Sequence, residues 1–98
     1  MSDLSVSIGG LILRHPVMLG SGPIGVRADD LIAYGQVAGA IITKSISVNP
    51  SRGSPPPRIV KMDRDGMINY EGGPNPGIDE FSKTLREVRS SVRCPIIG

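Results

Sequence analysis

The sequence predicts a parallel α/β fold, because three short apolar runs alternate with segments of helical character. The runs lie near Val17, Ile41 and Ile96 and are rich in aliphatic residues, as strands covered on both faces are. A barrel and a doubly wound sheet would both fit this pattern. A closed barrel needs eight strands and about 250 residues, so the 98 residues are expected to form an incomplete unit.

The first half of the chain is expected to open with a hairpin and continue as a parallel crossover unit. Residues 4–8 and 11–13 are the two hairpin strands, and they flank the turn signal Gly9-Gly10. The crossover unit then consists of a strand at 16–19, a helix within 29–37 and a strand at 40–43. A polar loop follows each of the two parallel strands, and the loop after the second strand begins at Lys44.

The second half predicts a long loop, a second hairpin, a helix and a third strand. The proline-rich residues 48–58 indicate an irregular connection, and residues 58–62 and 67–70 flank the turn 63–66. Five apolar residues at spacings of three and four predict one face of a helix over 78–92: Ile78, Phe81, Leu85, Val88 and Val92. Asn75 is the expected N-cap, with Pro76 at the first helical position. Residues 94–97 read as the third strand.

Composition excludes several classes of protein. The single cysteine, Cys94, cannot form an internal disulfide, and no neighbouring ligands suggest a metal site. The first residues resemble neither a secretory leader nor a membrane anchor, so a cytoplasmic protein is expected. The net charge of +2 is spread over interspersed acids and bases, which argues against a nucleic-acid surface. Motifs typical of a serine hydrolase, a nucleotide hydrolase or a dinucleotide-binding domain are not found.

Two segments follow parallel strands, where ligands bind in α/β folds. Lys44 could hold an anionic group there, or it could be an ordinary surface lysine. The backbone of residues 20–22 could approach a ligand closely, or form only a tight turn. Residues 69–75 form a polar loop in which Asn side chains suit an imide or cyclic urea, although a loop with a helix cap is the simpler interpretation.

Three other polar residues carry weaker signals. Glu71 is expected to be solvated, or to pair with an arginine such as Arg52 or Arg58. His15 precedes the first parallel strand, at the wrong end for catalysis, and is expected to be structural. Cys94 reads as a small buried residue rather than a nucleophile.

Four segments, in this order, resemble the dihydroorotate dehydrogenase family, class 1 type. They are residues 15–22 (HPVMLGSG), 39–45 (GAIITKS), 57–58 (PR) and 67–77 (MINYEGGPNPG). The family is a TIM (β/α)8 barrel that carries FMN and oxidises dihydroorotate to orotate in pyrimidine biosynthesis. The resemblance implies that residues 1–98 are the amino-terminal part of this catalytic domain, with about three of the eight strands, and that this part alone is inactive.

The resemblance also implies a site. Gly20 and Ser21 would lie against the flavin, Lys44 and Ser45 would contact FMN, and Lys44 would also face the substrate. Asn69 would hydrogen-bond the pyrimidine ring, and the backbone of Tyr70, Glu71, Gly72 and Gly73 would line its pocket. A base removes a proton from one ring carbon while hydride passes from its neighbour to flavin N5. That base, a Cys or Ser in the family, is expected beyond residue 98, and Cys94 does not match it.

Glu71 and Gly73 depart from the family pattern, and an Asn followed two places later by Glu resembles the dihydropyrimidine dehydrogenases. An FMN enzyme acting on uracil or thymine is therefore the first alternative. A non-enzymatic domain that binds an acidic partner through Arg52, Arg58, Lys61 and Arg64 is the second.

The electron acceptor stays open between fumarate, a nicotinamide reached through a partner subunit, and a quinone, which is less expected without an amino-terminal membrane helix. A homodimer is typical of soluble relatives.

Overall fold

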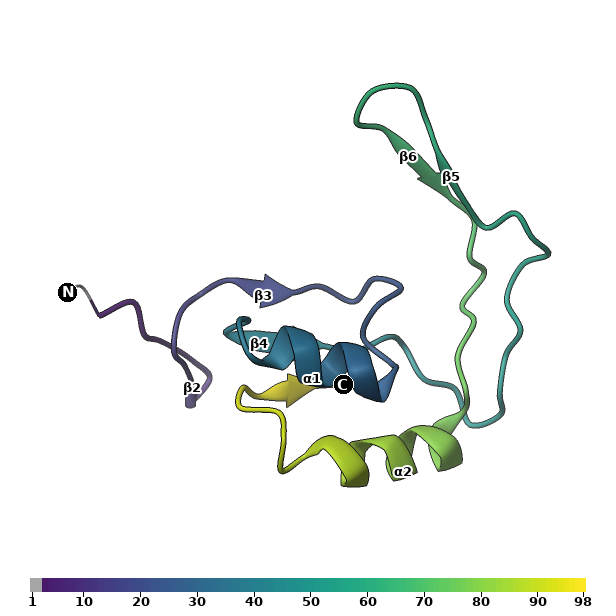
Figure 1. The fold of residues 1–98 in the computed structure, drawn as a ribbon. Helices are drawn as coiled ribbons and strands as arrows, with labels where there is room; N and C mark the ends of the chain where they lie inside the picture. The colour runs from purple at the N-terminus through teal and green to yellow at the C-terminus, as the bar shows by residue number, and fades with distance from the viewer. Residues whose placement is uncertain (1–2) are drawn as a thin grey trace.

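A three-stranded parallel sheet organises the chain. The computed structural model describes residues 3–98. Strands β3 (Met18–Leu19), β4 (Ala40–Ile42) and β7 (Ile96–Ile97) lie in the order β3-β4-β7, and both pairs are parallel (Figure 1). The expected parallel α/β arrangement is therefore confirmed, with the carboxyl ends of all three strands at one edge.

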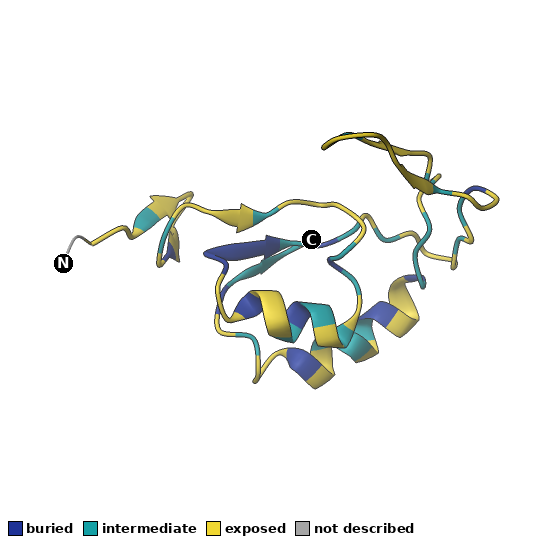
Figure 2. Cartoon of the chain, turned by 45° about the horizontal axis from the view of Figure 1, so that its top comes forward, coloured by how far each residue is buried: buried dark blue, intermediate teal, exposed yellow. Residues whose placement is uncertain are grey.

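Two helices cover one face of this sheet. Helix α1 (Ala28–Gly35) connects β3 to β4, and α2 (Ile78–Val88) packs beside it and precedes β7 (Figure 2). The buried core between helices and sheet consists of Leu31, Ala38, Ile41, Phe81, Val88 and Cys94. Apart from Phe81 these side chains are small or aliphatic, as the low aromatic content requires. None of the helices in the described residues is long and apolar enough to cross a bilayer.

Two antiparallel hairpins flank the sheet, as the sequence predicts. Strands β1 (Val6–Ile8) and β2 (Leu11–Leu13) form the first hairpin, and β5 (Ile59–Lys61) and β6 (Met67–Asn69) form the second. The second hairpin projects away from the sheet and helices (Figure 1). The radius of gyration, 15.2 Å, accordingly exceeds the roughly 13 Å of a compact chain of this length.

Helix α2 begins at Ile78, where the apolar pattern predicts it, but the expected cap is wrong. Asn75 is not the N-cap and Pro76 is not helical, because the helix begins at Ile78 with Gly77 as its cap residue. Gly77 has φ of 86°, and a Cβ there would lie 2.9 Å from the Pro50 nitrogen. Asn75 instead accepts hydrogen bonds through Oδ1 from the Gly77 N–H (3.0 Å) and the Ser47 N–H (3.1 Å). Asn75 therefore links Ser47, which precedes the proline-rich loop, to Gly77, which precedes α2.

Both helices end earlier than the apolar pattern predicts. Helix α1 ends at Gly35 and α2 at Val88, and each is followed by a turn that leads into the next strand. The pattern continues past α2 because Val92 still packs inward, against Gly35 of α1. Any Cβ on Gly35 would lie 2.7 Å from a Val92 methyl group, so glycine is what allows this approach.

Candidate functional site

The backbone of Lys44 is fixed at the carboxyl edge of the sheet, directly after β4. Its N–H donates to the Gly25 carbonyl (3.2 Å), and the N–H of the preceding residue, Thr43, donates to the Ile97 carbonyl (2.9 Å). The buried Thr43 hydroxyl also donates to the Lys44 carbonyl at 3.1 Å. This is the edge at which barrels and doubly wound folds bind ligands.

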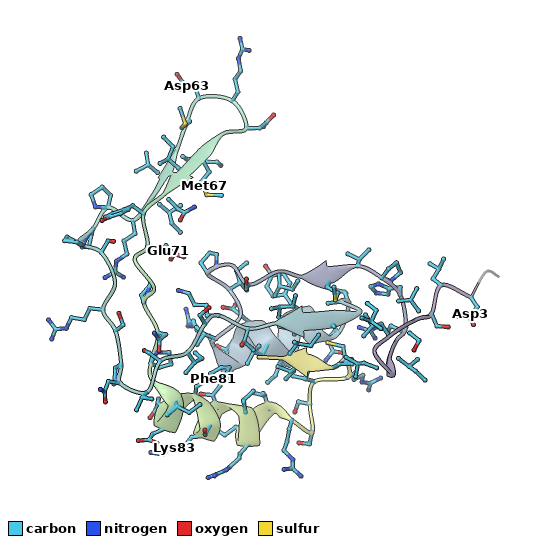
Figure 3. The ribbon with its side chains drawn as sticks, turned by 180° about the vertical axis from the view of Figure 1, so that it is seen from behind. Asp3, Asp63, Met67, Glu71, Phe81 and Lys83 are labelled. Carbon is cyan, nitrogen blue, oxygen red and sulfur yellow. The ribbon has the colours of Figure 1, made fainter. Side chains whose placement is uncertain are left out.

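The Lys44 side chain is paired with Glu71. Its Nζ lies 3.8 Å from Glu71 Oε1, and the two side chains are only 13% and 20% exposed. Glu71 follows β6, and its side chain points from the hairpin segment toward the sheet (Figure 3). The expectation that Glu71 is solvated or paired with an arginine is therefore wrong.

Arg58 is held by the proline-rich loop, which explains why it does not meet Glu71. Its guanidinium donates to the carbonyls of Ser54 (2.6 Å) and Arg52 (2.5 Å). The Ser54 N–H in turn donates to the Glu71 carbonyl at 2.7 Å. The loop thus fixes the backbone of Glu71 while Arg58 is occupied elsewhere.

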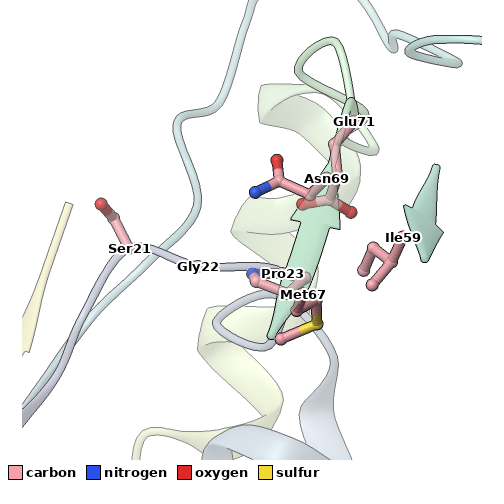
Figure 4. Close-up of a pocket in the computed structure, with 7 residues that line it drawn as sticks. All are labelled: Ser21, Gly22, Pro23, Ile59, Met67, Asn69 and Glu71. Carbon is pink, nitrogen blue, oxygen red and sulfur yellow. The ribbon is translucent and has the colours of Figure 1, made fainter. Parts of the chain in front are cut away.

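A pocket of about 250 Å³, here called the hairpin pocket, lies between the loop after β3 and one face of the second hairpin (Figure 4). It is lined by Ser21, Gly22, Pro23, Ile59, Met67, Asn69 and Glu71. Alternation along a strand places Met67, Asn69 and Glu71 on the same face, and Ile59 joins them because it pairs with Asn69 across the hairpin. The hairpin face of the pocket therefore presents both polar and apolar side chains.

A second cavity of about 470 Å³, the strand-end cavity, lies over the carboxyl ends of the strands. It is lined by Ser21, Ile42, Thr43, Lys44, Ser45, Ile46, Ile78, Phe81, Leu85 and Gly98. Ser21 lines both cavities, and the ion pair joins Lys44 of one to Glu71 of the other. Lys44 and Asn69, far apart in sequence, are thereby brought to adjoining sites.

Ser21, Lys44, Ser45, Asn69 and Glu71 are thus gathered around two adjoining cavities. The other predicted site residues line neither one. Gly20 lies next to Ser21, with open space where its Cβ would be, and Gly73 is likewise exposed to open space. Tyr70 is 73% exposed on the opposite hairpin face, and Gly72 packs against Ser54. Ligand contacts for all these residues stay predictions.

His15 and its neighbour Arg14 hold the segment between α1 and β4. His15 Nε2 donates to the Val37 carbonyl (2.7 Å), and its Nδ1 accepts from the Val17 N–H (3.2 Å). The Arg14 guanidinium donates to the carbonyls of Gly35 and Ala38. These contacts give His15 the structural role that the sequence predicts.

Cys94 is a buried core residue. Burial raises the pKa of its thiol above the usual value of 9.0, and the nearby charge of Arg14 lowers it by less. The thiol is therefore protonated and shielded at neutral pH, which agrees with a packing role.

Sequence reasoning missed the glycines that position the two charged residues. A Cβ on Gly25 would lie 2.9 Å from the Ile42 carbonyl oxygen and 3.0 Å from Thr43 Cα, so this glycine allows the loop to pack against the end of β4. A Cβ on Gly53 would overlap the Glu71 carbonyl. Their sequence signal, glycine within a loop, does not reveal which segment each one contacts.

Comparison with known proteins places this arrangement in a family. The family model described as Dihydroorotate dehydrogenase matches residues 3–98. The chain is 41% identical over 97 residues to "Dihydroorotate dehydrogenase B (NAD(+)), catalytic subunit" of Geotalea uraniireducens, covering 97% of this chain and 31% of that protein. It is 43% identical to the protein of the same name from Thermoanaerobacter pseudethanolicus, covering 98% and 33%.

Solved structures that resemble the chain are also dihydroorotate dehydrogenases. The ligand-free dihydroorotate dehydrogenase of Eimeria tenella superposes with a TM-score of 0.76 at 31% identity, covering 88% of this chain and 24% of that one. The same enzyme in complex with ferulenol gives a TM-score of 0.77 at 28% identity, covering 97% and 27%. The predicted fold class, part of a TIM barrel, is confirmed by these neighbours. The chain spans about a third of the length of the curated relatives it matches. It belongs to the dihydroorotate dehydrogenase family.

Proposed function

We propose that residues 1–98 are part of the catalytic domain of an FMN-dependent oxidoreductase that oxidises dihydroorotate to orotate in pyrimidine biosynthesis. The observation that carries this proposal is the convergence of Lys44 and Asn69 on adjoining cavities beside the carboxyl edge of the sheet, in a chain that belongs to the family. The activity is proposed for the longer protein, since the curated relatives are about three times the length of the chain.

The residues present fit FMN. The strand-end cavity has a polar end at Ser21, Lys44 and Ser45 and an apolar wall, and its volume of about 470 Å³ is typical of cofactor sites. At Gly20 and Gly22 the loop after β3 exposes backbone with no atom within 4 Å of where a Cβ would be, so a planar ring could approach it closely. When bound, FMN supplies the two-electron chemistry that side chains lack. The Lys44 ammonium would hold an anionic group of the cofactor or substrate.

The hairpin pocket would orient the pyrimidine ring. Asn69 offers both a donor and an acceptor to an imide edge, and Ile59 and Met67 supply an apolar surface for the ring. Holding the ring in one orientation is the contribution expected of the protein in such a reaction. The resemblance to the family implies that the general base, a Cys or Ser, lies on a residue beyond 98. Cys94 does not match that base, and its thiol is buried and protonated.

The relatives are named as catalytic subunits of an NAD(+) type. We therefore propose that the complete protein works with an electron-transfer partner subunit that passes electrons to a nicotinamide. A homodimer is the alternative assembly, and a cytoplasmic location is proposed from the sequence alone.

An enzyme acting on uracil or thymine is the second candidate. It is favoured by the position of Glu71, which brings an acid into the hairpin pocket beside Asn69.

The test uses the full-length protein, purified with its partner subunit. The proposal predicts bound FMN, a yellow absorbance that dihydroorotate bleaches anaerobically, and formation of orotate. Bleaching by dihydrouracil instead would favour the second candidate. A colourless protein that turns over neither compound would reject both.

A further inference from the structure

Each of the two adjoining cavities carries one charged side chain, and the two charges are opposite. Among residues 3–98, Lys44 is the only charged side chain that lines the strand-end cavity, and Glu71 is the only one that lines the hairpin pocket. Lys44 Nζ lies 3.8 Å from Glu71 Oε1. The cation of the proposed flavin cavity is therefore paired with a carboxylate that belongs to the neighbouring pocket.

This pair is shielded from water better than a surface ion pair. The Lys44 and Glu71 side chains are 13% and 20% exposed. The other ion pair within the described residues, Lys83 with Glu80 on α2, has side chains that are 68% and 65% exposed. A partly buried charge acts on its surroundings more strongly than a charge in open water. The Glu71 carboxylate is therefore expected to affect a ligand that binds beside Lys44.

The backbone holds both ends of the pair. Lys44 is fixed at the end of β4, where its N–H donates to the Gly25 carbonyl (3.2 Å). On the other side, the Ser54 N–H donates to the Glu71 carbonyl (2.7 Å), and a Cβ on Gly53 would overlap the same oxygen. Because these contacts restrict both backbones, the carboxylate stays within reach of the ammonium when a ligand enters the strand-end cavity.

We infer that Glu71 is a positioning residue that holds Lys44 and offsets its charge, and that it thereby lowers the reduction potential of a flavin bound in the strand-end cavity. The inference rests on the proposed function, since it assumes that this cavity takes FMN.

The physical reason is the charge of the reduced ring. Adding two electrons and one proton to an oxidised flavin leaves its ring negatively charged, so a cation beside the ring stabilises the reduced form. A carboxylate paired with that cation removes part of this stabilisation. In the proposed reaction dihydroorotate supplies the two electrons. Nicotinamide, the acceptor proposed above, is a weak oxidant, so a lower flavin potential favours the outward transfer of electrons.

The test measures the reduction potential of the bound flavin in the full-length protein, by spectroscopic titration against a reference dye. Glu71→Gln removes the charge with little change in shape. The reduced flavin is then expected to bind about tenfold more tightly relative to the oxidised flavin. For a two-electron couple, this change in the ratio of binding constants corresponds to a rise of about 30 mV.

Three further variants separate the charge of Glu71 from its packing. Glu71→Met also removes the charge and keeps a long flexible side chain, so the potential is expected to rise as it does in Glu71→Gln. Glu71→Asp keeps the charge and is expected to stay near the wild-type potential. Glu80→Gln is the matched control, because Glu80 belongs to the exposed pair on α2 and is expected to change the binding ratio less than about twofold.

Three results would overturn the inference while leaving the proposed function intact. The first is an unchanged potential in flavin-loaded Glu71→Gln or Glu71→Met. The second is an equal rise in Glu71→Asp, which would show that packing rather than charge matters. The third is loss of flavin from both uncharged variants, which would show that Glu71 builds the cavity instead of tuning it. A wild-type protein that holds no flavin would instead reject the proposed function, and the inference with it.

Discussion

Gly25→Ala tests whether the loop after β3 positions Lys44. The added methyl group would lie 2.9 Å from the Ile42 carbonyl oxygen and 3.3 Å from the Lys44 nitrogen, where ordinary contacts begin at 3.4 Å. The loop or the end of β4 must therefore retreat by roughly half an ångström. Overpacking of this kind costs about 1–3 kcal/mol.

The same movement stretches the hydrogen bond from the Lys44 N–H to the Gly25 carbonyl, now 3.2 Å. A bond of this type contributes about 0.5–1.5 kcal/mol, and the lower entropy of unfolded alanine returns about 0.4–1 kcal/mol. The free energy of unfolding should therefore fall by about 1–3 kcal/mol. Because Lys44 moves with the strand end, flavin affinity should fall as well.

Urea unfolding of the full-length protein measures the first effect, and flavin release on dilution measures the second. Gly22→Ala is the stability control, since it lies in the same loop with no atom within 4 Å of its Cβ position. It should be neutral or slightly stabilising. If Gly25→Ala unfolds within about 0.5 kcal/mol of Gly22→Ala, the loop does not pack against Lys44 in the way described.

Three further predictions concern the full-length protein. Lys44→Ala should lower flavin affinity or turnover, measured by flavin titration and steady-state kinetics, and unchanged values for both would remove Lys44 from the site. Asn75→Ala should lower the free energy of unfolding, measured with urea, by about 1–3 kcal/mol, because the variant loses the hydrogen bonds to Ser47 and Gly77. Asn49→Ala is the control and should leave this free energy unchanged, because the Asn49 side chain makes no hydrogen bond within residues 3–98. Since burial raises the pKa of Cys94, its thiol should react slowly with a disulfide reagent at pH 8 until the protein unfolds, and its contribution to stability should be lost as the pH rises above about 9; rapid labelling of folded protein would contradict its burial.

The sequence predicts the elements well because their signals are local. Alternating residues on either side of Gly9-Gly10 suffice for the first hairpin, and one apolar face suffices for α2. The ends of the helices depend instead on distant contacts. Asn75 is a residue type that often caps helices, but its side-chain oxygen accepts hydrogen bonds from Ser47 and Gly77 instead. The contact with Ser47 is distant in sequence, so no local pattern predicts it.

The candidate site likewise has a part that the sequence predicts and a part that it does not. Lys44 is predictable because a residue after a buried parallel strand must emerge at the ligand-binding edge. Its pairing with Glu71 is not, because the partner is chosen by how the proline-rich loop folds back. That loop engages Arg58 through its own carbonyls, so the arginines that the sequence offers as partners are not the ones that Glu71 meets.

The register of the second hairpin decides which side chains line the hairpin pocket. Side chains alternate along β6, so Asn69 and Glu71 share the pocket face only while Val60 pairs with Ile68 and the Tyr70 N–H donates to the Arg58 carbonyl (2.7 Å). A slip of one residue would turn Ile68 and Tyr70 toward the pocket and remove both polar groups at once. The backbone position of Lys44 does not depend on this register, because it is fixed by hydrogen bonds at the end of β4. Substitutions that shift the hairpin register would therefore change the lining of the hairpin pocket, whereas the backbone of Lys44 would keep its place at the end of β4.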